Sequence, residues 1–161
     1  PIVRHRRAVD KGQSAAQLRS MTTKPFPARS PAEKVGGLVY FGRMLDKIRA
    51  HARGALPPEY VEKLGDGFDG RCVRFLGLKY EDVVARVNEG GTDDEIWQWA
   101  LENGRGTSAE DKENWNEFLR KCGWKDSVTP TLERRKKESG FQDRADIETM
   151  FQFIDADEGR L

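Results

Sequence analysis

Residues 30–53 read SPAEKVGGLVYFGRMLDKIRAHAR, and this stretch predicts a long first helix. Ser30 can cap the helix, Pro31 suits its first turn and Glu33 completes a capping box. Gly54 follows as a stop signal. The apolar residues recur at helical spacing and form a single stripe, made by Leu38, Phe41, Leu45, Ile48 and Ala52.

Three glycines interrupt this predicted helix, at Gly36, Gly37 and Gly42. Each costs about 1 kcal/mol relative to alanine inside a helix. A close approach by a neighbouring element, most often another helix, is the usual reason for such glycines, and we expect one here.

Helix signals recur along the rest of the chain. Thr92–Glu95 forms a second capping box, and Ser108 or Thr107 caps a later helix. The apolar face of that later helix is expected to hold Trp115, Phe118, Leu119 and Cys122.

Residues 65–70 are expected to be a turn-rich loop. Residues 71–76 are ambiguous between helix and strand, and we expect a helix because their surroundings are helical. Further helices are expected at about 58–64, 80–89 and 129–138 and after Asp143.

The fold class follows from these signals. The chain shows no clear alternation of apolar and polar residues that would indicate a sheet. We therefore predict an all-α fold, a single compact domain of about seven short-to-medium amphipathic helices with short loops and no substantial sheet.

The charge is nearly balanced but unevenly distributed. The 161 residues include 28 Lys and Arg against 27 Asp and Glu, a net charge of +1. Residues 1–29 hold seven basic residues and one acidic residue, so they carry +6 and the remainder carries −5. We expect residues 1–24 to be a basic, flexible N-terminal arm or extension, because they hold few large apolar side chains, and 25–161 to be the helical domain.

Met21 is interpreted as a natural start, with 1–20 as an upstream extension. Arg4, Arg6 and Arg7 are the arm's candidate contacts to nucleic acid or another acidic surface.

Several classes of protein are excluded by composition. No apolar run approaches the roughly 20 residues of a membrane-spanning helix, so no membrane partner is expected. The cysteines number only two, Cys72 and Cys122, which excludes a disulfide scaffold and makes a zinc site within one chain improbable. Neighbouring Arg71 and Arg74 would lower the pKa of Cys72 if they lay close to its thiol. Catalytic, phosphate-binding and dinucleotide-binding motifs are absent, so we expect no catalytic residues, no metal and no cofactor.

Four residues stand out as candidate ligand or partner contacts. Arg43, Asp46 and His51 are the polar set of the first predicted helix, although Arg43 and Asp46 could equally pair on the helix surface. Trp99 lies about 200° around its helix from Trp97, on the side of Glu95 and Glu102. An exposed tryptophan often marks a partner contact, but another element could instead cover it.

Nine stretches in this order together resemble a bacterial family called domain of unknown function 5069. They are Arg29-Ser30-Pro31, Gly36-Gly37-Leu38-Val39, Arg43-Met44-Leu45-Asp46-Lys47, Leu56-Pro57-Pro58, Leu64-Gly65-Asp66-Gly67-Phe68-Asp69, Glu89-Gly90-Gly91-Thr92-Asp93-Asp94-Glu95, Trp115-Asn116, Lys121-Cys122-Gly123-Trp124 and Phe153-Ile154-Asp155-Ala156-Asp157-Glu158-Gly159-Arg160. The resemblance covers roughly residues 24–161 and implies a soluble bacterial protein, with a cytoplasmic location. It supplies no activity to carry over.

Three functional hypotheses remain open at this point. The first is a non-catalytic protein-interaction or regulatory module of the bacterial cytoplasm. The second is a small-molecule-binding protein or enzyme, with a pocket beside the glycine-containing first helix. The third is nucleic-acid contact through the basic arm, which the acidic domain disfavours unless the arm is native. The oligomeric state is left open.

Overall fold

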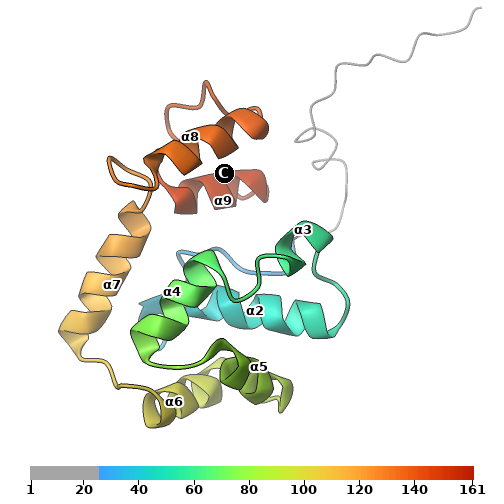
Figure 1. Ribbon diagram of the computed structural model, residues 1–161, viewed down its shortest axis with the longest axis vertical. Coiled ribbons are helices and arrows are strands. Elements are labelled where there is room, and N and C mark those ends of the chain that lie inside the picture. Colours follow the sequence, from blue (N-terminus) through green and yellow to red (C-terminus); the bar gives the residue numbers. More distant parts are fainter. Residues whose placement is uncertain (1–25) are drawn as a thin grey trace, which may run out of the picture.

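The computed structural model describes residues 26–161, which form eight helices and one two-stranded hairpin. The fold is predominantly α, as predicted, with one small sheet that was not expected (Figure 1). The elements in chain order are β1 Lys34–Val35, β2 Leu38–Val39, α2 Phe41–Ala52, α3 Pro58–Val61, α4 Gly67–Leu76, α5 Tyr80–Asn88, α6 Asp93–Asn103, α7 Ala109–Lys121, α8 Thr129–Glu138 and α9 Met150–Asp157.

The hairpin replaces the first half of the predicted 30–53 helix. Val35 pairs with Leu38 across a loop of two glycines. Gly36 has φ 60° and Gly37 has φ 80°, and positive φ at both loop positions is what a tight type I′ hairpin turn requires. The helix prediction is therefore right for 41–52 and wrong for 30–40, where local turn chemistry outweighs the capping signal.

The glycines do mark a close approach, and the neighbour is a ring from α6. A Cβ on Gly36 would lie 2.2 Å from the indole of Trp97, so no larger residue fits there. Gly42 is crowded by the side chains of Arg29 and Val35 instead.

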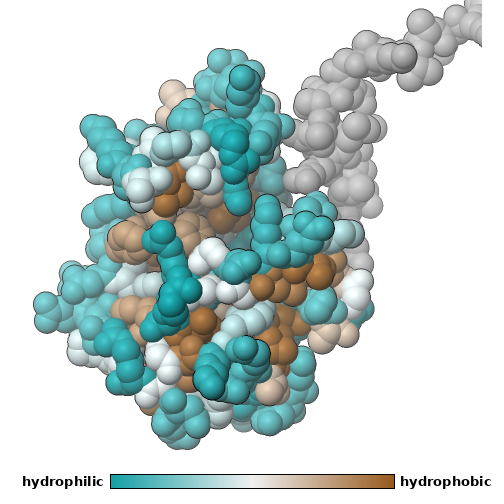
Figure 2. All heavy atoms as spheres, viewed as in Figure 1, coloured by the Kyte–Doolittle hydropathy of each residue, from teal (hydrophilic) through white to brown (hydrophobic). Residues whose placement is uncertain are grey.

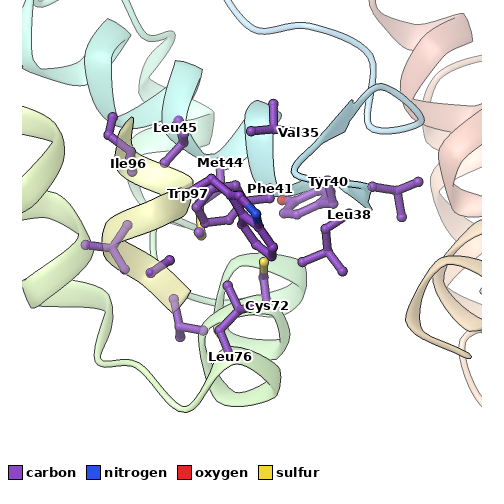
Figure 3. Close-up of a cluster of buried hydrophobic side chains, with 14 of the residues drawn as sticks. Val35, Leu38, Tyr40, Phe41, Met44, Leu45, Cys72, Leu76, Ile96 and Trp97 are labelled. Atoms are coloured by element: carbon purple, nitrogen blue, oxygen red, sulfur yellow. The ribbon is translucent and has the colours of Figure 1, made fainter. Parts of the chain in front are cut away.

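The main core lies where the hairpin and α2 meet α4, α5, α6 and α7. Phe41, Leu38 and Met44 are among its largest fully buried side chains. Figure 3 shows side chains from the hairpin, α2, α4 and α6 converging on this cluster, with Trp97 among them. A smaller second core joins α8 and α9 and is formed by Leu132, Ile147, Met150, Phe153 and Ala156.

The helices around the two cores lie at opposite ends of the molecule. In Figure 1, α8 and α9 lie at one end, α5 and α6 lie at the other, and α7 runs along one side between them. On the face drawn in Figure 2, hydrophilic side chains surround smaller hydrophobic areas. Within residues 26–161, no helix has the length and apolar character needed to cross a membrane.

The capping box predicted at Thr92 is confirmed, because the Thr92 hydroxyl accepts a hydrogen bond from the backbone N–H of Glu95 and the Glu95 carboxylate accepts one from the backbone N–H of Thr92. Of the two caps predicted for the later helix, Ser108 is the one that the structure uses, in a box with Asp111. The helix predicted at 71–76 is also confirmed. The loop predicted at 65–70 is right only for residues 65 and 66, since α4 already begins at Gly67.

Candidate functional site

A buried polar cluster joins α2 to α4. The Lys47 ammonium lies 2.7 Å from Oδ1 of Asp69 and donates a 3.1 Å hydrogen bond to the Tyr40 hydroxyl. Tyr40 in turn donates to the same Asp69 oxygen at 2.9 Å, and the other oxygen accepts from the backbone N–H of Gly65. Asp69 was expected to be a turn residue, but it is completely buried and serves as the acceptor at the centre of this cluster.

The backbone and the electrostatics of this cluster are both unusual. Tyr40 has φ 72°, a left-handed conformation that a bulky residue adopts only where its surroundings impose it. Burial, then the charge of Asp69, raises the pKa of Tyr40, and burial lowers the pKa of Lys47. Lys47 is 7% exposed and Asp69 is 0% exposed, so this cluster is almost entirely shielded from solvent.

A second buried pair ties α9 to α2. The Arg43 guanidinium binds both carboxylate oxygens of Glu158, and it also donates to the backbone oxygen of Arg29 at 2.9 Å. The Tyr60 hydroxyl donates to Glu158 at 3.1 Å, and Arg160 pairs with the same carboxylate. Arg43 therefore acts as an anchor for the end of the chain.

Asp46 belongs to a separate network on the surface of α2. Arg29 binds both of its carboxylate oxygens, at 2.7 and 2.8 Å, and also pairs with Asp93 at 2.8 Å. Arg49 completes the network through a 2.7 Å contact with Asp93. The surface pair suggested between Arg43 and Asp46 is wrong, because each side chain turns to a different partner.

The predicted polar set of the first helix is thus not brought together. Arg43 is buried, Asp46 lies in the surface network and His51 is exposed near the end of α2. Trp99 is half-buried and packs against the main core, so another element covers part of it, as the second interpretation allowed. Arg4, Arg6 and Arg7 lie outside the described residues.

The two cysteines are free and buried. Burial raises the pKa of the Cys72 thiol, so the lowering suggested by Arg71 and Arg74 is wrong. Burial also raises the pKa of Cys122. Within residues 26–161, no group of three His, Cys, Asp or Glu side chains is arranged to hold a metal ion.

Two exposed aromatic side chains mark the C-terminal end of α7. Phe118 is 51% exposed, which corrects its predicted place on the buried face, and Trp124 just beyond the helix is 48% exposed. The Arg71 guanidinium lies 5.6 Å from the Phe118 ring centre, and the Lys125 ammonium lies 4.9 Å from that of Trp124. We call these four residues the α7-end surface.

The family model described as Domain of unknown function (DUF5069) matches residues 25–160. The chain belongs to this family. The match confirms the resemblance seen in the sequence, and the DUF5069 region includes every described helix. Among curated proteins, none matches the chain. The family description names no activity, so a function has to be inferred from the residues of this DUF5069 domain.

The α7-end surface was missed from the DUF5069 sequence for a specific reason. Phe118 follows Trp115 by three residues, a spacing that predicts the same face. The buried stripe instead runs through Trp115, Leu119 and Cys122, at spacings of four and three, and leaves Phe118 to one side. Only the exact angular position of Phe118 around α7, relative to the buried stripe, could have shown that it is exposed.

Two concave regions of the described residues lie elsewhere. One, of about 380 Å³, is lined by charged side chains of α7 and by Lys34 and Gly37 of the hairpin. The other, of about 400 Å³, lies between α5 and α6 and includes Trp99. Neither is lined by Arg43, Asp46 or His51, although the first borders Gly37, one of the glycines of the predicted first helix.

Proposed function

We propose that this protein is a non-catalytic interaction module of the bacterial cytoplasm that docks an acidic segment of a partner protein on the α7-end surface. The proposal depends on two exposed aromatic rings, Phe118 in the last turn of α7 and Trp124 three residues beyond its end. Large aromatic side chains supply much of the energy at the centres of protein interfaces, and they are costly to leave in water.

The cations beside these rings support a partner that carries negative charge. Arg71 and Lys125 each approach an aromatic ring, an arrangement that holds the charge in place while its hydrogen-bond donors remain available. An acidic side chain arriving at the surface could therefore meet a positioned cation beside an apolar contact.

The charges around this end of α7 also favour an acidic partner. Four cations lie at or beside this end of the helix, namely Arg71, Arg120, Lys121 and Lys125. They face two carboxylates, of which Glu117 pairs with Arg120 and Lys121. Asp126 is occupied by backbone N–H groups, including that of Gly123 at 2.8 Å. This local excess of positive charge contrasts with the net −5 of residues 30–161, so an acidic partner would be directed to this end.

The cytoplasmic assignment is supported by the cysteines. Both are free thiols, which suits a reducing compartment. The same acidic domain disfavours nucleic acid as the main partner, since neutralising phosphates would have to overcome its overall repulsion.

The experiment is a selection of short random peptides displayed on phage, performed on the wild-type protein. We expect selected peptides to be rich in Asp and Glu and to lose binding when Phe118→Ala or Trp124→Ala is introduced. Leu161→Ala is the matched control, because Leu161 is an exposed apolar residue outside this surface. Thermal melting checks that each variant is folded.

Two results would reject the proposal. One is peptides whose binding does not depend on Phe118 and Trp124. The other is tight binding of an oligodeoxythymidylate that is lost in the same two variants, which would assign the surface to single-stranded nucleic acid.

A further inference from the structure

A second concave site lies at the end of the molecule opposite α8 and α9. We call it the α5–α6 pocket, after the two helices that line it; their place in the fold is seen in Figure 1. It has a volume of about 400 Å³, within the roughly 300–1,000 Å³ range of small-molecule sites. Its lining comes from the turn before α5, from one face of α5 and from α6, and consists of Gly77, Leu78, Lys79, Asp82, Ala85, Arg86, Glu89, Trp99 and Asn103.

Trp99 gives this pocket an aromatic wall. The residue is half-buried, packing against the main core and lining the pocket. Asn103 donates a 2.9 Å hydrogen bond to the backbone oxygen of Trp99, which leaves the amide oxygen of Asn103 as an acceptor. The tryptophan is therefore held by the fold and still accessible in part.

The charged side chains of the pocket balance one another. Lys79 and Arg86 bring two positive charges, and Asp82 and Glu89 bring two negative charges. Within the described part of the chain, no ion pair joins any of these four. Arg86 is steadied by a 2.7 Å hydrogen bond to the backbone oxygen of Gly90. The pocket therefore offers hydrogen-bond donors and acceptors on a lining with no net charge.

We propose that the α5–α6 pocket binds a neutral pyranose sugar. One face of a pyranose ring carries apolar C–H groups that match a flat indole, here Trp99, and its rim carries hydroxyl groups that both donate and accept. Asp82 and Glu89 would accept from these hydroxyls, and Lys79 would donate to them. A phosphate-bearing ligand would face the two carboxylates, and a cationic ligand would face Lys79 and Arg86, so the balanced lining favours a neutral ligand.

This site is independent of the proposed docking surface. The pocket belongs to α5 and α6, whereas the α7-end surface lies where α7 leads to α8 (Figure 1). The failure of either proposal therefore leaves the other intact.

The test follows the indole N–H signal of Trp99 in nitrogen-15 NMR spectra of the full chain. Glucose, galactose, mannose and N-acetylglucosamine are titrated separately. We expect at least one of them to move this signal in a saturable way. Asp82→Asn and Glu89→Gln should each weaken the binding by about fivefold or more, because the amide oxygen still accepts but lacks the negative charge that strengthens the hydrogen bond.

Glu81→Gln is the matched control, since Glu81 is an exposed carboxylate on the same helix but outside the pocket lining. It should leave the affinity unchanged. These exposed substitutions avoid the risk that replacing Trp99 unfolds the domain.

Three outcomes would overturn the proposal. They are no shift with any of the four sugars, a saturable shift that ignores Asp82→Asn and Glu89→Gln, and a shift produced by inorganic phosphate or tetramethylammonium but not by sugars. The last result would make the pocket a site for ions.

Discussion

Replacing Lys47 with methionine should cost this protein a large part of its stability. Lys47 is 7% exposed and its ammonium lies 2.7 Å from Asp69, which is fully buried. Methionine retains most of the side-chain volume but leaves the Asp69 carboxylate without its cation. Breaking one side of a buried ion pair costs about 3–5 kcal/mol, a large fraction of the roughly 5–15 kcal/mol that stabilises a typical domain. We expect the melting temperature to fall by about 10–20 °C.

Urea denaturation followed by circular dichroism measures the free energy directly. Lys63→Met is the matched control, because Lys63 is exposed, and its effect should stay within about 0.5 kcal/mol. Adding Asp69→Asn to Lys47→Met removes the uncompensated charge, so the double variant should lose clearly less than the sum of the single losses. A loss below about 1 kcal/mol for Lys47→Met would refute the idea that this cluster holds α2 against α4.

Two further predictions concern the hairpin and the alkaline limit of stability. Gly36→Ala places a methyl group against the Trp97 ring at φ 60° and should cost about 2–5 kcal/mol by chemical denaturation, whereas Gly54→Ala, at φ 66° in open space, should cost only about 1–2 kcal/mol; equal losses would reject the contact. Burial raises the pKa of Cys72 and of Tyr40 above their ordinary values of 9.0 and 10.0, so the folded state keeps protons that the unfolded chain loses. Denaturation between about pH 8 and 11 should show stability falling by about 1.4 kcal/mol per pH unit for each such group above its unfolded pKa. Lys47, with a lowered pKa, acts in the opposite direction below its ordinary 10.5, and a Cys72→Ala variant that keeps the full slope above pH 9.0 would contradict this assignment.

Local sequence signals predicted a helix correctly where the hydrogen bonds that stabilise its end join residues close together in the sequence. The hydrogen bonds of the capping boxes at Thr92 and Ser108 all lie within four residues. The box at Thr92 was predicted, and Ser108 was one of the two caps predicted for its helix. The capping box predicted at Ser30 is wrong: its residues fit the same pattern, but no helix begins there. There the Ser30 hydroxyl donates to Asp155, which lies 125 residues further along the chain, and two glycines turn the following backbone into a hairpin.

The candidate site was harder to predict because its partners are distant in sequence. Arg43 was predicted as a ligand or partner contact, or as a surface partner of Asp46, whereas its partner in the structure, Glu158, lies 115 residues away, and no spacing rule links them. Lys47 and Asp69 are 22 residues apart on different helices, and only the tertiary fold brings their side chains together. Exposure of Phe118 likewise depends on how α7 lies against β2 and α9, which the helical repeat of α7 alone does not determine.

Calorimetric titration with a selected acidic peptide is the decisive measurement for the proposed docking of an acidic protein segment on the α7-end surface. The Kd of Phe118→Ala should exceed that of the wild type by about 30-fold, as for an interface hot spot, and added salt should weaken the wild-type complex. Leu161→Ala, exposed but outside the surface, should change the Kd by less than about twofold. A Phe118→Ala protein that is folded and binds the peptide as tightly as the wild type would contradict the account.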